Sequence, residues 1–79
     1  MNESIKELVA IGASIGAHCQ PCLKYHIQAA IKLGIEPDEI RQAIAVGHRV
    51  EKGSMDAMKK FSAGALKDLI TTYPTQEIL

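Results

Sequence analysis

The stretch CQPCLKYHIQAAIKLG, residues 19–34, decides the expected fold. Pro21 suits the first position of a helix, because its missing N–H has no intrahelical acceptor there. Gly34 suits the position just after a last helical turn, where a left-handed residue commonly ends the helix. Between them, apolar residues recur at spacings of three and four rather than in strict alternation. The stretch therefore predicts a helix from about Pro21 to Leu33.

The same periodicity continues through nearly the whole chain, so the sequence predicts an all-α fold with four helices. Gly53 is interpreted as the end of the third helix, and Ser54 as the N-cap of the fourth. Besides the helix already described, the expected bounds are about Ser4–Ala17, Pro37–Gly53 and Ser54–Ile70, followed by a tail at residues 74–79.

Chain length allows one domain, residues 1–79, with a thin core. A chain of this size buries only about 60% of its unfolded surface. Aromatic residues make up only 4% of it, and folds this small usually need a disulfide, a metal or a partner subunit. The fourth predicted helix carries an apolar face that is wide for such a small protein. We therefore expect a homo-oligomer, with this face as the subunit contact: Met55, Met58, Phe61, Ala65, Leu66 and Leu69.

The charge balance excludes several classes of partner. Nine Lys and Arg offset nine Asp and Glu, and no basic stripe is present, which argues against nucleic acid. No apolar run approaches the ~18–20 residues of a membrane span. The first residues lack the basic start and apolar core of a secretory signal. A cytoplasmic, reducing location is the expectation.

Cys19, Cys22 and His26 form the candidate active site. Three-residue spacing at a helix start brings the two thiols within disulfide reach, and the N-terminal helix dipole favours a thiolate. His26 lies one turn after Cys22 on the same face, where its imidazole can take the Cys22 proton or stabilise the thiolate. The dipole alone mildly favours Cys19 as the attacking thiol. The specific base beside Cys22 outweighs it.

Three other interpretations of the cysteines stay open. The pair could bind zinc, with His26 and either His18 or His48 completing the ligands. It could be inert packing, because free Cys behaves as a small apolar residue. It could also switch a non-catalytic, oligomeric redox-sensing or interaction module. His18 is expected in a loop near the thiols, and His48 near the end of the third helix.

The sequence contains the pattern E-x11-C-x-x-C-x3-H, formed by Glu7, Cys19, Cys22 and His26. With this pattern the chain resembles the carboxymuconolactone decarboxylase superfamily and, within it, the alkylhydroperoxidase D (AhpD)-like core. The resemblance covers roughly Ile5 to Leu69. The chain carries one copy of that core, and Gln20-Pro21 stands between the two cysteines where AhpD has a His.

The resemblance implies a thiol-dependent peroxidase or disulfide reductase. Cys22 would be oxidised to a sulfenic acid, Cys19 would close the disulfide, and Glu7 and His26 would relay protons. It also implies a trimer or hexamer, a small peroxide or disulfide substrate, an external dithiol as reductant, and no cofactor. Ser4 and Glu7 also match a capping box, and a side chain folded back onto its own helix start could not reach His26.

Overall fold

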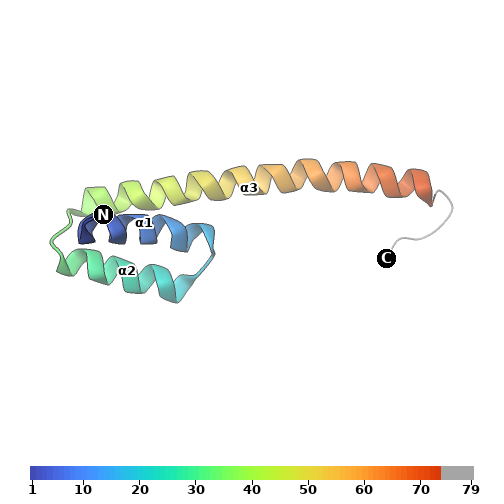
Figure 1. The fold of residues 1–79 in the computed structure, drawn as a ribbon. Coiled ribbons are helices and arrows are strands. Elements are labelled where there is room, and N and C mark those ends of the chain that lie inside the picture. The colour runs from blue at the N-terminus through green and yellow to red at the C-terminus, as the bar shows by residue number, and fades with distance from the viewer. Residues whose placement is uncertain (74–79) are drawn as a thin grey trace.

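The computed structural model describes residues 1–73, and within them the chain forms three helices (Figure 1). These are α1 (Glu3–Gly16), α2 (Gln20–Lys32) and α3 (Pro37–Thr72). The expected all-α class is confirmed. The predicted tail at residues 74–79 lies outside the described part of the chain.

Helix α1 begins at Glu3, one residue before the predicted start at Ser4. The Asn2 Oδ1 accepts a hydrogen bond from the Ile5 N–H at 2.8 Å, so Asn2 is the N-cap. The predicted capping box of Ser4 and Glu7 is therefore wrong. Asn is as good an N-cap as Ser. An N-cap at Asn2 instead of Ser4 therefore lengthens the helix at its start and keeps a capping side chain. Glu7 is left free for another contact.

Helix α2 follows its prediction within one residue at each end. Cys19 is the N-cap, Pro21 lies in the first turn, and Leu33 is the C-cap. Gly34 then adopts a φ of +80°, the left-handed conformation that glycine reaches without steric cost. The start of this helix therefore carries both cysteines.

The expected break at Gly53 is wrong, because α3 runs through it for 36 residues. A glycine inside a helix costs only about 1 kcal/mol relative to alanine. Lys52 and Asp56 offset part of that cost with an ion pair of 2.8 Å across the predicted break. Ser54 therefore caps nothing, and the described residues contain three helices instead of the expected four.

Helix α1 packs against both of the other helices, whereas α2 and α3 scarcely meet (Figure 1). The core gathers apolar residues from all three helices and from the α2–α3 turn. It consists of Ile11, Ala30, Ile35 and Ile40, with Leu8, Leu23, Ile27, Ala43 and Ile44 packed against them.

The crossing of α1 and α3 depends on one glycine. A Cβ atom at Gly47 would lie 2.7 Å from the Ile15 Cβ and 2.9 Å from the Gly12 carbonyl oxygen. Real Cβ contacts are not that short, so a larger residue would force the helices apart. By contrast, a Cβ at Gly12 would meet the Ala43 carbonyl oxygen at an ordinary 3.5 Å.

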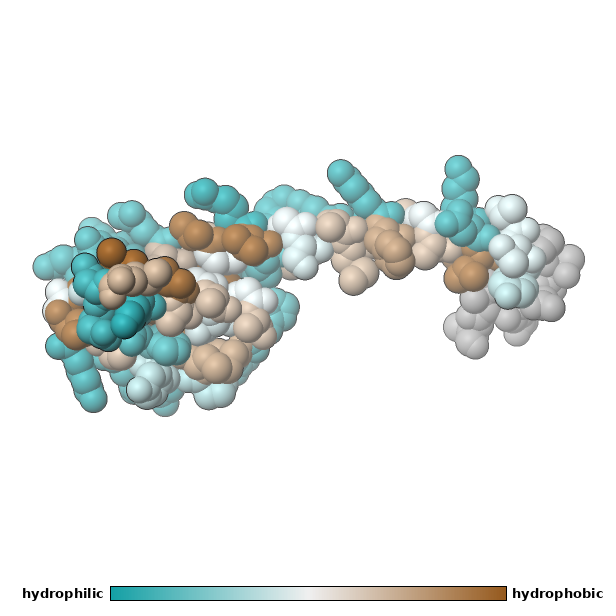
Figure 2. All heavy atoms as spheres, viewed as in Figure 1, coloured by the Kyte–Doolittle hydropathy of each residue, from teal (hydrophilic) through white to brown (hydrophobic). Residues whose placement is uncertain are grey.

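The second half of α3, residues 52–72, projects beyond the ends of α1 and α2 (Figure 1). We call it the arm, and residues 3–51 the body. Hydrophobic residues gather along the arm in Figure 2, and they are exposed: Met55, Met58, Phe61, Leu66, Leu69 and Ile70. The protein measures 61 × 20 × 19 Å, its length reflecting this projection. No helix in the described residues combines the length and the apolar character needed to cross a bilayer.

Candidate active site

Cys19 and Cys22 form a disulfide at the start of α2. Cys19 is the N-cap, and its Sγ accepts a hydrogen bond from the Cys22 N–H at 3.3 Å. Cys19 is half-buried and Cys22 is exposed. The predicted pairing distance is thus present, and of the two bonded cysteines Cys22 is the more exposed.

Glu7 and His26 meet between α1 and α2. The Glu7 Oε2 lies 2.7 Å from the His26 Nδ1. Both side chains are largely shielded, at 18% exposed for Glu7 and 29% for His26. The register match had placed these two residues in one relay, whereas the capping box would have kept Glu7 away. The observed contact favours the relay geometry.

The Glu7 carboxylate fixes the orientation and tautomer of His26. An ionised carboxylate only accepts hydrogen bonds, so the Nδ1 must carry the proton that it donates to Glu7. In the neutral ring, the Nε2 is then the unprotonated nitrogen. The Tyr25 ring stands edge-on to the imidazole with centroids 5.1 Å apart, which further restricts its rotation. His26 therefore offers one nitrogen to take up a proton, on the face of α2 that also carries Cys22.

A second group of ionisable side chains, missed by the sequence analysis, lies on the Cys19 side. The Glu51 Oε2 is 2.9 Å from the His18 Nε2, and its Oε1 is 3.0 Å from the His48 Nδ1. The hydrogen bond with His48, aided by the charge of His18, lowers the pKa of the Glu51 carboxyl against the opposing effect of desolvation. The i, i+3 spacing of His48 and Glu51 was visible in the sequence, but the link to His18 depends on how α3 crosses the α1–α2 turn.

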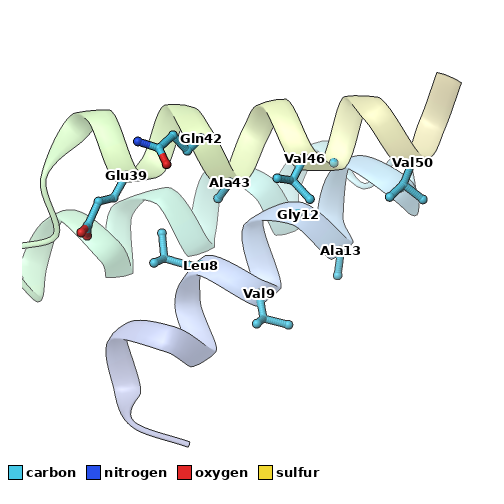
Figure 3. Close-up of a pocket in the computed structure, with 11 residues that line it drawn as sticks. Leu8, Val9, Gly12, Ala13, Glu39, Gln42, Ala43, Val46 and Val50 are labelled. Atoms are coloured by element: carbon cyan, nitrogen blue, oxygen red, sulfur yellow. The ribbon is translucent and has the colours of Figure 1, made fainter.

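A hollow lies away from these residues, between α1 and α3. It is an apolar groove of about 690 Å³, and Figure 3 shows side chains of both helices lining it. Leu8 and Val9 contribute from α1, and Val46 and Val50 from α3. None of the four predicted site residues lines this groove, so it does not belong to the thiol site.

The arrangement of the histidines does not match the zinc interpretation. His26 is turned to Glu7, whereas His18 and His48 both face Glu51. Within residues 1–73, no group of three or more His, Cys, Asp or Glu side chains is placed to hold a metal ion. The four ligands that a zinc site would need are thus not gathered around the two cysteines.

Comparison with known proteins supports the resemblance seen in the motif. Residues 2–67 match the model of the carboxymuconolactone decarboxylase family, a span that includes all four predicted site residues. Comparisons with curated proteins and with solved structures gave no match.

Proposed function

The chain belongs to the carboxymuconolactone decarboxylase family, and from that premise we propose that it is an AhpD-like thiol oxidoreductase that reduces small peroxides or disulfides. The observation that carries the proposal is the 2.7 Å contact between Glu7 and His26, one helical turn from Cys22. This contact supports His26 as an oriented base, and His26 follows by one helical turn the Cys22 whose sulfur is bonded to that of Cys19. The proposal locates the reaction in a reducing, cytoplasmic compartment.

The oxidative half of the cycle uses Cys22. Its thiol proton passes to the free nitrogen of His26, and the thiolate attacks the distal oxygen of a hydroperoxide. The S–O bond forms, the O–O bond breaks, and the leaving alkoxide takes a proton to depart as an alcohol. Cys22 is left as a sulfenic acid, oxidised by two electrons. With a disulfide substrate, the same attack gives a mixed disulfide and releases a thiol.

Cys19 completes the cycle. Its sulfur attacks the Cys22 sulfur, forming the observed Cys19–Cys22 disulfide and releasing water or, from a mixed disulfide, the second thiol. An external dithiol then supplies two electrons and two protons, which restore both thiols and leave that dithiol oxidised. No other co-reactant is needed. Glu7 acts throughout by stabilising the imidazolium that forms on His26.

The Glu7→Gln variant tests this assignment. The amide oxygen can still accept the Nδ1–H hydrogen bond but lacks the negative charge that stabilises an imidazolium, so we expect peroxide turnover to fall about tenfold, within the range of acid–base contributions. Glu3→Gln is the matched control, since Glu3 is an exposed residue on α1 whose partner is Lys6. Equal turnover in both variants and the wild type would remove Glu7 from the mechanism.

We also propose that the protein works as a homo-oligomer, either a trimer or a hexamer, held together through the arm. In proteins most helical stability comes from tertiary packing, and Gly53 and Gly64 lower the helix propensity of the arm. Its exposed apolar face would be stabilised by packing against other copies. The same observation supports the second candidate function, a non-catalytic interaction module whose thiols sense redox state. Peroxide turnover separates the two.

A further inference from the structure

His18 adopts a left-handed backbone conformation, which is uncommon for residues other than glycine. Its φ is +55°, and among residues 1–73 no other non-glycine residue has a positive φ. The His18 N–H bonds to the Ile15 carbonyl at 3.0 Å, and the Cys19 N–H bonds to the Ser14 carbonyl at 3.0 Å. These two bonds form the Schellman ending of α1, in which the left-handed position is usually glycine. A histidine costs roughly 1 kcal/mol or more there relative to glycine, and its side chain makes a contact that glycine would lack.

The imidazole of His18 is held from across the fold. Glu51 reaches from α3 to within 2.9 Å of the His18 Nε2. Its second carboxylate oxygen is fixed by His48, one turn earlier on α3, at 3.0 Å. Because the ionised carboxylate only accepts, the His18 Nε2 carries the donated proton and the Nδ1 is the open nitrogen of the neutral ring.

All these groups border one hollow next to the half-buried Cys19. The hollow measures about 370 Å³ and is lined by His18, Cys19, His48 and Glu51. Helix α1 adds Ser14 and Ile15 to its wall, and α2 adds Gln20 and Leu23. None of these four ionises near neutral pH. The titratable groups that face Cys19 across the hollow are thus two imidazoles and one carboxylate.

We propose that His18 and Glu51 form a second imidazole–carboxylate pair that acts on Cys19, with Glu51 as the positioning residue, and that this pair sets the reduction potential of the Cys19–Cys22 couple. The inference rests on the proposed redox function and adds a control to the same site. Each sulfur then has its own pair: Cys22 has His26 with Glu7 from α1, and Cys19 has His18 with Glu51 from α3.

The physical effect acts on the reduced protein. Two electrons and two protons from an external dithiol break the S–S bond and leave two thiols. The Cys19 proton can pass to the His18 Nδ1, and the thiolate and imidazolium then attract each other, while the hydrogen bond to Glu51 stabilises the protonated ring. This interaction is absent from the disulfide, which has no charge on sulfur. Stabilising the dithiol form alone makes the pair easier to reduce, so its potential rises.

Two variants and one control test this in the full chain. Glu51→Gln removes the charge that holds His18. His18→Gly removes the imidazole and relieves the left-handed backbone, so its fold should be at least as stable as the wild type. Asp56→Asn is the matched control, because Asp56 lies five residues further along α3 and pairs with Lys52 instead of a histidine.

The readout is the equilibrium of each protein with glutathione redox buffers, quantified by mass after acid quenching. We expect Glu51→Gln and His18→Gly each to shift the equilibrium about three- to tenfold toward the disulfide. That corresponds to about 14–30 mV at 29.6 mV per tenfold for a two-electron couple. Asp56→Asn should stay at the wild-type value. The double variant should shift no further than His18→Gly, because Glu51 acts through His18.

A second readout excludes a merely structural role. In a Cys22→Ser background, the rate of Cys19 alkylation by iodoacetamide should rise with pH. Adding His18→Gly should move the midpoint of that rise to higher pH. The inference is overturned if Glu51→Gln and Asp56→Asn have the same potential, or if the shifts of Glu51→Gln and His18→Gly add in full. The redox titration uses no peroxide. A wild type without peroxide turnover would therefore contradict the proposed function, and the measured reduction potentials would still test this inference separately.

Discussion

The body and the arm of this protein share the same spacing of apolar residues but differ in whether those residues are buried. In the body, apolar residues of α1, α2 and the first half of α3 bury one another, with Ile11 and Ala30 fully enclosed. In the arm, apolar residues recur at similar spacing yet remain exposed, as Phe61 does at 71%. The difference shows that helical periodicity identifies an apolar face, but does not say whether that face is buried within the same chain.

The proposed chemistry and the proposed assembly lie in different parts of the molecule. The disulfide, the Glu7–His26 pair and the Glu51 cluster all lie in the body. The arm offers Met55, Met58 and neighbouring apolar side chains but none of the predicted site residues. We therefore expect that substitutions can damage turnover and assembly separately.

The largest effect is expected from the thiols. Cys22→Ser removes the attacking sulfur, so peroxide turnover should fall by about a thousandfold or more. Cys19→Ser should allow one oxidation of Cys22 and then stop, since no resolving thiol remains. Both should keep the wild-type mass in analytical ultracentrifugation. Loss of the assembly in either variant would show that the thiols also hold subunits together, and the separation of body and arm would fail.

The next largest effect is expected in the arm. Phe61→Glu places a charge in the middle of the proposed subunit contact, where burying an aromatic anchor is typically worth about 2 kcal/mol or more. Sedimentation of the wild type should give three or six times the 8.6 kDa chain mass, and this variant should give a smaller species. Ser62→Glu is the matched control, because it adds the same charge at the next residue of the helix, and it should assemble like the wild type. An 8.6 kDa wild type, or equal assembly in Phe61→Glu and wild type, would contradict the role of the arm.

A smaller effect is expected where α1 crosses α3. Gly47→Ala would press a methyl group against Ile15 and the Gly12 carbonyl, so the free energy of unfolding should fall by about 1–3 kcal/mol. Gly12→Ala meets only an ordinary contact and should cost clearly less. Urea unfolding of the two variants measures the difference. If they are equally stable, the close approach at Gly47 is not a packing constraint.

The smallest effect tests the continuity of α3 between body and arm. A Cβ at Gly53 meets nothing within 4 Å, so Gly53→Ala should stabilise the protein by up to about 1 kcal/mol through helix propensity alone. Thermal unfolding followed by circular dichroism measures this. A destabilised variant would instead indicate a helix end at Gly53 that needs a left-handed residue.

Some of this could be predicted from sequence, and the reasons differ from residue to residue. Pro21 and Gly34 bounded α2 correctly, because local backbone preferences act there without opposition. The pair of Cys19 and Cys22 was predictable because three-residue spacing at a helix start fixes its geometry. The predicted helix end at Gly53 was wrong, because a single glycine is a weak helix breaker and no tertiary contact favours a turn after it.

Side chains that meet across helices were harder to predict. Local pattern alone assigned Glu7 to a cap, whereas Asn2 took that position and left Glu7 to meet His26. Only the motif register pointed to the correct partner. Glu51 was missed because its contact with His18 depends on how α3 crosses the turn between α1 and α2. A helical pattern specifies a face, and the crossing then decides which residues of two faces meet.

The central claim is that Cys22 is the thiol oxidised by peroxide, with His26 and Glu7 as its base. The most direct measurement is mass-spectrometric trapping of a sulfenic acid with dimedone in Cys19→Ser, after one equivalent of hydrogen peroxide. We predict a dimedone adduct on Cys22 that forms at least about tenfold more slowly when Glu7→Gln is added. If no adduct forms on Cys22, or if it forms equally fast with Glu7→Gln, the proposed mechanism is contradicted.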